Sequence, residues 1–214
     1  MIIRHIGHAE FRIETESGIR MVTDPYDETC GYPVYPIECD ITLVSHGHHD
    51  HNAVGILKGS PKIIRHAGVH TPFQGVRITA VRAFHDDALG TKRGETLVFM
   101  IETEGLRIVH LGDLGCMLTD EQISILENPD ILMIPVGGFF TIDGLQAKET
   151  MESLRARITL PMHYKTKYNE EWPISGPEVF LGQMAGKTIM RDAEALRVAA
   201  GDVECQPDVV LFRQ

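Results

Sequence analysis

The sequence predicts an α/β protein in which β-sheets pack face to face and helices lie on the outside. Three observations lead to this fold class. The first half of the chain is rich in short β-like runs, and the second half mixes apolar strands with helical patterns. In addition, residue types that bind metals stand repeatedly just past an apolar run, and the ends of strands are where sites form in layered α/β folds.

Strands and turns dominate the first half. Gly7 and the pair Ser17-Gly18 interrupt the opening segment, and residues 29–36 form a loop rich in Gly and Pro. The continuous apolar run 41–44 is typical of a strand buried on both faces. Glu104-Gly105 is a hairpin turn signal. The predicted strands span 2–6, 9–15, 19–23, 41–44, 62–65, 76–83, 96–103 and 106–111, and a short helix is expected over 52–58.

Helices enter in the second half. A helix is predicted over 120–127, with Thr119 or Asp120 as its N-cap. The clearest helix spans 146–157, because its apolar residues recur at helical spacing. Those residues are Ala147, Met151, Leu154 and Ile158. Further strands are expected at 131–135, 158–160 and 209–212, and a further helix at 177–185.

Composition limits the function classes. The chain has 214 residues, 43% of them hydrophobic and 23% charged, and no linker rich in Gly, Pro or Ser divides it, so we predict a single domain over 1–214. The net charge of -10 argues against nucleic-acid binding and anionic membranes. Its four cysteines form no Cys-x-x-Cys pair, no leader pattern opens the chain, and no apolar stretch reaches about 18 residues. We therefore expect a cytoplasmic protein that acts on a small molecule, with a homo-oligomer left open.

The segment Ser45-His46-Gly47-His48-His49-Asp50-His51 follows the buried strand 41–44 and indicates a metal site. His46 and His48 are two residues apart, so strand alternation points both to the same side and toward one ion. Asp50 and His51 lie in the turn and can reach a second position. One tetrahedral ion would leave ligands over, which favours two ions. His49 points the other way and is not expected to be a ligand.

Three further residues stand just past apolar strands and can complete a two-metal site. They are His85, Asp113 and His163, with Asp113 in a Gly-flanked turn that suits a carboxylate bridging two cations. Each alone could be an ordinary polar residue at a strand end, but their order along the chain favours ligands. Asp24 is either an outer partner of a ligating histidine or a plain turn residue before Pro25. The remaining histidines at 5, 66, 70 and 110 are not expected to bind metal.

Together these residues resemble the signature of metallo-β-lactamase-fold hydrolases, which is His-x-His-x-Asp-His followed by a lone His, an Asp after a strand and a last His. The resemblance covers almost the whole chain. It is closest to a branch of small bacterial metal-dependent hydrolases related to an ascorbate-phosphate lactonase and to an N-acyl-phosphatidylethanolamine phospholipase D. Motifs shared with that branch are Gly-His-Ala-Glu-Phe at 7–11, Asp-Pro at 24–25, Gly-Asp-Leu-Gly at 112–115 and Pro-Met-His-Tyr at 161–164.

The resemblance implies a four-layer αβ/βα sandwich with two divalent ions, zinc first and manganese or iron as alternatives. By this resemblance Asp113 bridges the ions. The other ligands divide into His46, His48 and His85 for metal 1 and Asp50, His51 and His163 for metal 2. The implied nucleophile is a hydroxide between the metals, since coordination lowers the pKa of water from about 15.7 to about 7. Asp50 is the expected general base.

Substrate contacts are less specified. His8 and Tyr164 are candidates for binding the substrate oxyanion, although His8 could equally make a structural hydrogen bond. Lys148, Lys165 and Arg93 are candidates for recognising a phosphate or carboxylate. The chain departs from the related branch at His49, at Asp86-Asp87 and at Leu114, which leaves the substrate open.

The leading hypothesis is a dinuclear hydrolase of a small ester, lactone or phosphodiester. A di-metal redox protein that reduces oxygen is an alternative, because the superfamily contains di-iron members, although those normally carry a flavin domain. A metal-binding protein without catalysis is a second alternative. β-Lactamase activity itself is not expected, since Asp113 stands where a true lactamase usually has Cys.

Overall fold

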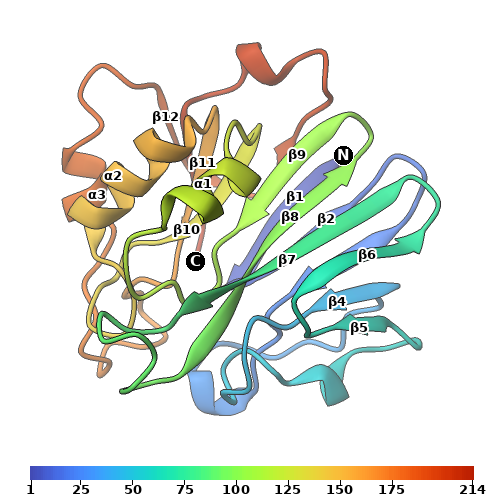
Figure 1. Cartoon of the computed structure of the whole chain (residues 1–214), viewed down its shortest axis with the longest axis horizontal. Coiled ribbons are helices and arrows are strands. Elements are labelled where there is room, and N and C mark those ends of the chain that lie inside the picture. The colour runs from blue at the N-terminus through green and yellow to red at the C-terminus, as the bar shows by residue number, and fades with distance from the viewer.

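The computed structural model describes residues 1–214 and consists of two mixed β-sheets packed face to face (Figure 1). The six-stranded sheet has the order β13-β1-β2-β3-β4-β5. Its strands are β1 (Ile2–Gly7), β2 (Glu10–Glu14), β3 (Arg20–Thr23), β4 (Ile41–Leu43), β5 (Lys62–Ile64) and β13 (Leu196–Arg197). Strands β1, β2 and β3 pair in antiparallel fashion, whereas β3, β4 and β5 are parallel.

The second sheet has eight strands in the order β12-β14-β11-β10-β9-β8-β7-β6. Its strands are β6 (Gly68–Phe73), β7 (Val76–Phe84), β8 (Glu95–Thr103), β9 (Leu106–His110), β10 (Ile131–Pro135), β11 (Ile158–Met162), β12 (Ile189–Ala193) and β14 (Val209–Phe212). The half from β6 to β9 is antiparallel, and the half from β9 to β12 is parallel. The chain thus turns from hairpins to crossovers at β9.

The main core lies between the two sheets and contains 28 buried residues from both. Strand β10 shows how alternation builds the layers. Ile131 and Met133 point into the core between the sheets, whereas Leu132 and Ile134 belong to a second cluster on the helix side. Both faces of the strand are therefore buried, which is why its sequence is continuously apolar.

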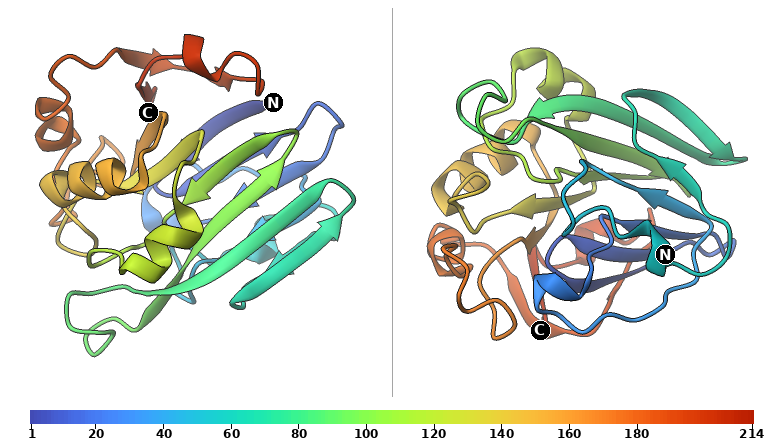
Figure 2. Two further views of the ribbon diagram at one scale, coloured as in Figure 1. Left: turned by 45° about the horizontal axis from the view of Figure 1, so that its top comes forward. Right: turned by 90° about the horizontal axis from the view of Figure 1, so that it is seen from below.

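The three α-helices lie against the eight-stranded sheet (Figure 2). They are α1 (Asp120–Leu126), α2 (Gly144–Leu154) and α3 (Glu178–Gly182). Thr119 caps α1 and Asp143 caps α2, each in a capping box with the Gln three residues later. None of the helices is long and apolar enough to cross a membrane.

The outer face of the six-stranded sheet is covered by loops and by two 3-10 helices, η1 (Glu28–Cys30) and η2 (Val54–Ile56). Val22 of β3 packs there against Ile37 and Cys39 in a small cluster. A further 3-10 helix, η3 (Val203–Cys205), precedes β14. The predicted α/β sandwich of two mixed sheets is confirmed, with an outer layer over this sheet that is thinner than the helical layer over the other.

Two of the predicted elements are wrong in detail. Residues 52–58 form only the short η2, because the backbone on either side bonds to distant loops: Ala53 N donates to Pro25 O (2.8 Å) and Lys58 N to Ile37 O (2.8 Å). The predicted helix 177–185 is confined to α3. Strand β6 has no counterpart in the prediction, since this edge strand is largely exposed on both faces and lacks a clear apolar alternation.

Candidate metal centre

The predicted ligands lie past the ends of four strands that meet at one rim of the sandwich. His46 follows β4 of the six-stranded sheet. His85, Asp113 and His163 follow β7, β9 and β11 of the eight-stranded sheet. The two sheets therefore bring together residues that are separated by more than a hundred positions in the sequence.

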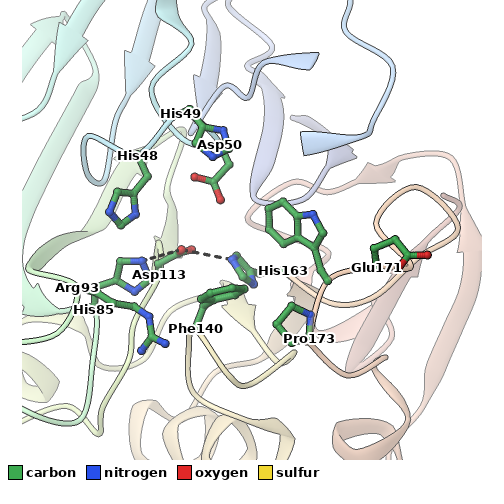
Figure 3. Close-up of a pocket in the computed structure, with 11 residues that line it drawn as sticks. His48, His49, Asp50, His85, Arg93, Asp113, Phe140, His163, Glu171 and Pro173 are labelled. Carbon is green, nitrogen blue, oxygen red and sulfur yellow. Dashed lines mark ion pairs between the residues drawn. The ribbon is translucent and has the colours of Figure 1, made fainter. Parts of the chain in front are cut away.

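The Asp113 carboxylate is the centre of the cluster. Its Oδ2 lies 3.3 Å from His85 Nε2 and 3.3 Å from His163 Nε2, the two ion pairs drawn in Figure 3. Oδ1 lies 3.2 Å from His51 Nε2, and His46 Nε2 is 3.8 Å from Oδ2. Four imidazoles thus face one buried carboxylate, from opposite sides.

The donor atoms fall into groups whose members lie within 4.8 Å of one another. One group is His46, His48 and His85. Another is His8, Asp50, His51 and His163. A third, formed by His46, His51 and Asp113, joins the two. The division follows the one expected from the resemblance, with His8 as an addition.

Two glycines allow the loops to approach the candidate ligands His85 and His163 closely. A Cβ at Gly115 would lie 2.3 Å from the backbone of His85 and Asp86, and one at Gly137 would lie 2.2 Å from His163 O. Any side chain at these positions would push His85 or His163 out of place. Gly115 was noted in the sequence only as part of a turn, and its packing role emerges from the fold.

Asp24 orients the candidate ligands of the histidine motif from behind. This fully buried carboxylate accepts hydrogen bonds from Ser45 N (2.7 Å), Ser45 Oγ (2.7 Å) and His51 Nδ1 (3.0 Å). Ser45 Oγ in turn lies 2.9 Å from His46 Nδ1. With Nδ1 of both rings engaged, Nε2 of both rings faces the centre, which is the arrangement that outer partners of metal ligands impose. Asp24 is thus a partner of the site and not only a turn residue.

The electrostatics of the cluster favour added positive charge. Burial lowers the pKa of His46 to about 3, so its ring is neutral, the form that binds metals. Burial would also lower the pKa of His51, but the Asp113 and Asp24 carboxylates outweigh it and raise that pKa well above its usual value. Burial would raise the pKa of Asp113, yet His163 and His51 hold it well below its usual range.

The residues fit a bound cation. His51 Nε2 and Asp113 Oδ1 are both buried without a hydrogen-bond partner. Because His51 donates its Nδ1 proton to Asp24, Nε2 is the atom that faces the Asp113 carboxylate 3.2 Å away, and the raised pKa of the ring means that this place favours a positive charge, whether a proton or a metal ion. Two electron-pair donors in such contact are stabilised by a cation between them, and imidazole and carboxylate are the donors that zinc, manganese and iron accept.

His8 and Tyr164, the candidate substrate contacts, are placed differently. The buried His8 ring lies 4.1 Å from the His163 ring, and its Nε2 lies 3.4 Å from Asp50 Oδ2. Tyr164 packs in the cluster between the eight-stranded sheet and the helices. Neither lines the cavity above the ligands. His8 therefore joins the cluster through its contact with Asp50, whereas Tyr164 lies outside the cluster.

A cavity of about 470 Å³ opens over the candidate ligands. Its wall adds His49, Arg93, Phe140, Glu171, Trp172 and Pro173. Arg93 was a sequence candidate, whereas Lys148 and Lys165 do not reach the cavity. His49, directed away from the ligands, stands at the rim with its Nδ1 2.8 Å from Thr29 Oγ1. No motif marked Phe140 or the segment 171–173, since both lie in loops without periodicity.

Comparisons with known proteins agree with this geometry. Residues 2–163 match the family described as the beta-lactamase superfamily domain. The chain belongs to the metallo-β-lactamase superfamily. Within that superfamily, a UPF0173 metal-dependent hydrolase from Thermoplasma volcanium is 34% identical over 192 residues, which cover 77% of this chain and 83% of that protein. A UPF0173 metal-dependent hydrolase from Thermococcus onnurineus is 29% identical over 228 residues, which cover 92% and 99%.

A solved structure supports the same assignment for this metallo-β-lactamase superfamily member. The crystal structure of a candidate Zn-dependent hydrolase of the superfamily from Thermotoga maritima gives a TM-score of 0.81 at 34% identity, over 99% of this chain and 97% of that chain. The expected family is confirmed, and with it the enzyme class. The protein is a metal-dependent hydrolase.

Proposed function

We propose that this hydrolase is dinuclear and cleaves a small ester, lactone or phosphodiester. The observation that carries the proposal is the pair of ligand groups joined through Asp113. His46, His48 and His85 would hold one ion. Asp50, His51 and His163 would hold the other. The many imidazoles favour zinc, with manganese or iron as alternatives. When bound, such ions lower the pKa of water toward neutrality and neutralise charge at the scissile group.

Asp50 is the proposed general base. Its side chain borders the cavity, beside the candidate ligands (Figure 3). Burial would raise its pKa, but His8 and His51 outweigh it and keep the pKa well below the usual range. The carboxylate is therefore ionised at neutral pH and can accept a proton from the attacking water at Oδ1, the oxygen that His8 does not contact.

His8 is the proposed positioning residue for Asp50. Burial lowers the pKa of His8 to about 3, so its ring is neutral and can donate one N–H. Its Nε2 faces Asp50 Oδ2 at 3.4 Å. This contact holds one carboxylate oxygen and leaves the other free to turn toward the cavity.

The cavity suits a small molecule. Its volume of about 470 Å³ falls within the usual range for ligand pockets, roughly 300–1,000 Å³. The centre lies at the floor of the cavity, so a bound molecule would place its scissile bond beside Asp50 and Asp113.

Metal analysis and a substrate screen test the proposal together. Protein purified without added metal is expected to hold close to two equivalents. Bis-p-nitrophenyl phosphate, lactones and aryl esters are then assayed with wild type and Asp50→Ala, and the variant is expected to lose at least about 100-fold in kcat. The matched control is Asp40→Ala, which removes a surface carboxylate paired with Arg20.

Three results would count against the proposal. A metal content near zero that persists after metal addition would remove the dinuclear centre. Two bound equivalents without turnover of any substrate class would leave a metal-binding protein, and a turnover unchanged in Asp50→Ala would remove Asp50 as the base.

A further inference from the structure

Arg93 is the only Arg or Lys in the wall of the cavity. It lies in the loop between β7 and β8, which begins with the candidate ligand His85. In Figure 3 its side chain lies near Phe140 and His85, on the other side of Asp113 from Asp50. The Arg93 side chain can therefore contact a part of the substrate that lies away from Asp50.

The Arg93 guanidinium has no carboxylate partner within the protein. The neighbouring cation Lys92 is paired with Asp87 at 2.6 Å, which neutralises the exposed acid of this loop. Arg93 forms no such ion pair, and its guanidinium carbon lies 5.3 Å from the centre of the Phe140 ring and 5.8 Å from that of Phe139. Aromatic contact supports the guanidinium plane and leaves its N–H donors available.

The loop that carries Arg93 is held in place by Asp86. The Asp86 carboxylate accepts hydrogen bonds from the backbone N–H groups of Ala88, Gly90, Lys92 and Arg93, at 2.8, 2.9, 3.0 and 2.7 Å. These donors outweigh burial and hold the pKa of Asp86 at about 2, so the carboxylate is ionised. The backbone of Arg93 is thereby tied to the residue that follows His85. The position of Arg93 relative to the candidate ligands is therefore fixed by the hydrogen bonds of its loop.

We infer that the substrate of this centre carries an oxyanion, a carboxylate or a phosphate, which Arg93 binds at a distance from the scissile bond. The guanidinium fork matches two oxygens of such a group in a bidentate contact. Phe140 and Trp172 line the cavity beside it and would pack on the carbon skeleton between the two ends of the substrate. The inference rests on the proposed hydrolase, whose substrate class it narrows from any small ester, lactone or phosphodiester to those with a second, anionic end.

Binding can be measured without turnover, because Trp172 is the only tryptophan of the chain and lines the cavity. Metal-loaded protein is titrated with malonate, succinate and glutarate, each beside its monomethyl ester, and Trp fluorescence is followed. One carboxylate is available to the metals in every probe, so the diacid differs by the group offered to Arg93. At least one diacid is expected to bind about 10- to 100-fold more tightly than its monoester. A parallel titration with 3-phosphonopropionate shows whether a phosphonate or a carboxylate increases the affinity more.

The Arg93→Gln variant is expected to abolish the advantage of the diacid while it retains wild-type metal content. Lys92→Gln, on the same loop but paired with Asp87, is the matched control and should retain the advantage. The inference is overturned if no diacid exceeds its monoester in wild type, or if Arg93→Gln weakens diacid and monoester alike.

Kinetics separate this inference from the proposed function. The 4-nitrophenyl esters of succinate and of monomethyl succinate are compared, and Arg93→Gln should lower the ratio of their kcat/KM values by about 10- to 100-fold, mainly through KM. Asp50-dependent turnover with an unchanged ratio would overturn the anion site and leave the hydrolase. Arg93-dependent binding of diacids without turnover of any ester would overturn the proposed hydrolase activity and leave the anion site.

Discussion

The floor and the wall of the cavity are built in opposite ways. On the floor, His51, Asp24 and Asp113 are at most 2% exposed, and each side chain is held by at least one buried partner. On the wall, Arg93 and Phe140 come from loops and are only partly buried, and the adjoining Phe139 is 62% exposed. Strand ends thus carry the candidate metal ligands, and loops form the wall that a bound molecule would meet.

The largest effect is expected from the floor, at Asp24→Asn. Ser45 N donates to Oδ1 of Asp24, so the amide oxygen of Asn must stay there and the NH2 group must face His51. A donor at that place favours the His51 tautomer with the proton on Nε2, which cannot bind metal. Metal affinity should fall about 10- to 100-fold, as for other outer partners of ligating histidines, and chelator competition measures it.

The comparison predicts that this loss is specific to the floor. Asp40→Asn, at a surface ion pair with Arg20, should leave metal affinity as in wild type. If Asp24→Asn binds metal as tightly as wild type, His51 does not depend on its partner, and the contrast between a supported floor and an adaptable wall fails there.

A smaller effect is expected from the wall, at Asp86→Ala. This change removes the acceptor of four backbone hydrogen bonds in the loop that carries Arg93. The Tm should fall by about 5 °C, and the diacid advantage should drop about tenfold because Arg93 is no longer fixed. The metal content should change little, since His85 N is still bonded to Gly94 O and Gly115 N to Phe84 O.

Thermal unfolding, metal analysis and Trp172 fluorescence on the same Asp86→Ala preparation check this prediction. The Lys92→Gln variant, which leaves the Asp86 hydrogen bonds intact, serves as its control. A complete loss of metal in Asp86→Ala would mean that wall and floor are one cooperative unit.

The contrast between floor and wall also explains which site residues could be predicted from the sequence. The candidate ligands stand out because each follows an apolar strand and because the motif 46–51 is local, so spacing alone relates its members. Asp24 could not be decided, since a buried partner and a turn residue before Pro25 look alike until the fold brings Ser45 to it. Phe140 and Trp172 could not be found at all. They meet Arg93 only through the packing of three loops, which leaves no period in the sequence.

The fold divides in a similar way. The strands between 76 and 135 were predicted within one or two residues, because strong alternation or continuous apolar runs reflect their burial. The helix expected at 52–58 was wrong because hydrogen bonds to Pro25 and Ile37 determine that segment. Local preference was outweighed there by contacts that no local pattern records.

The smallest effect is expected at Tyr164→Phe, although Tyr164 directly follows the candidate ligand His163. Its ring packs in the cluster between sheet and helices, its hydroxyl is buried without a hydrogen-bond partner, and it does not line the cavity. Removing that hydroxyl breaks no hydrogen bond, so kcat/KM should change less than about twofold and metal content should stay the same. Trp172→Phe, which alters a residue of the wall, should change KM more. A fall of tenfold or more in kcat for Tyr164→Phe, with normal metal content and Tm, would mean that its hydroxyl contacts the substrate. Residues at the strand ends would then also form part of the substrate-binding wall.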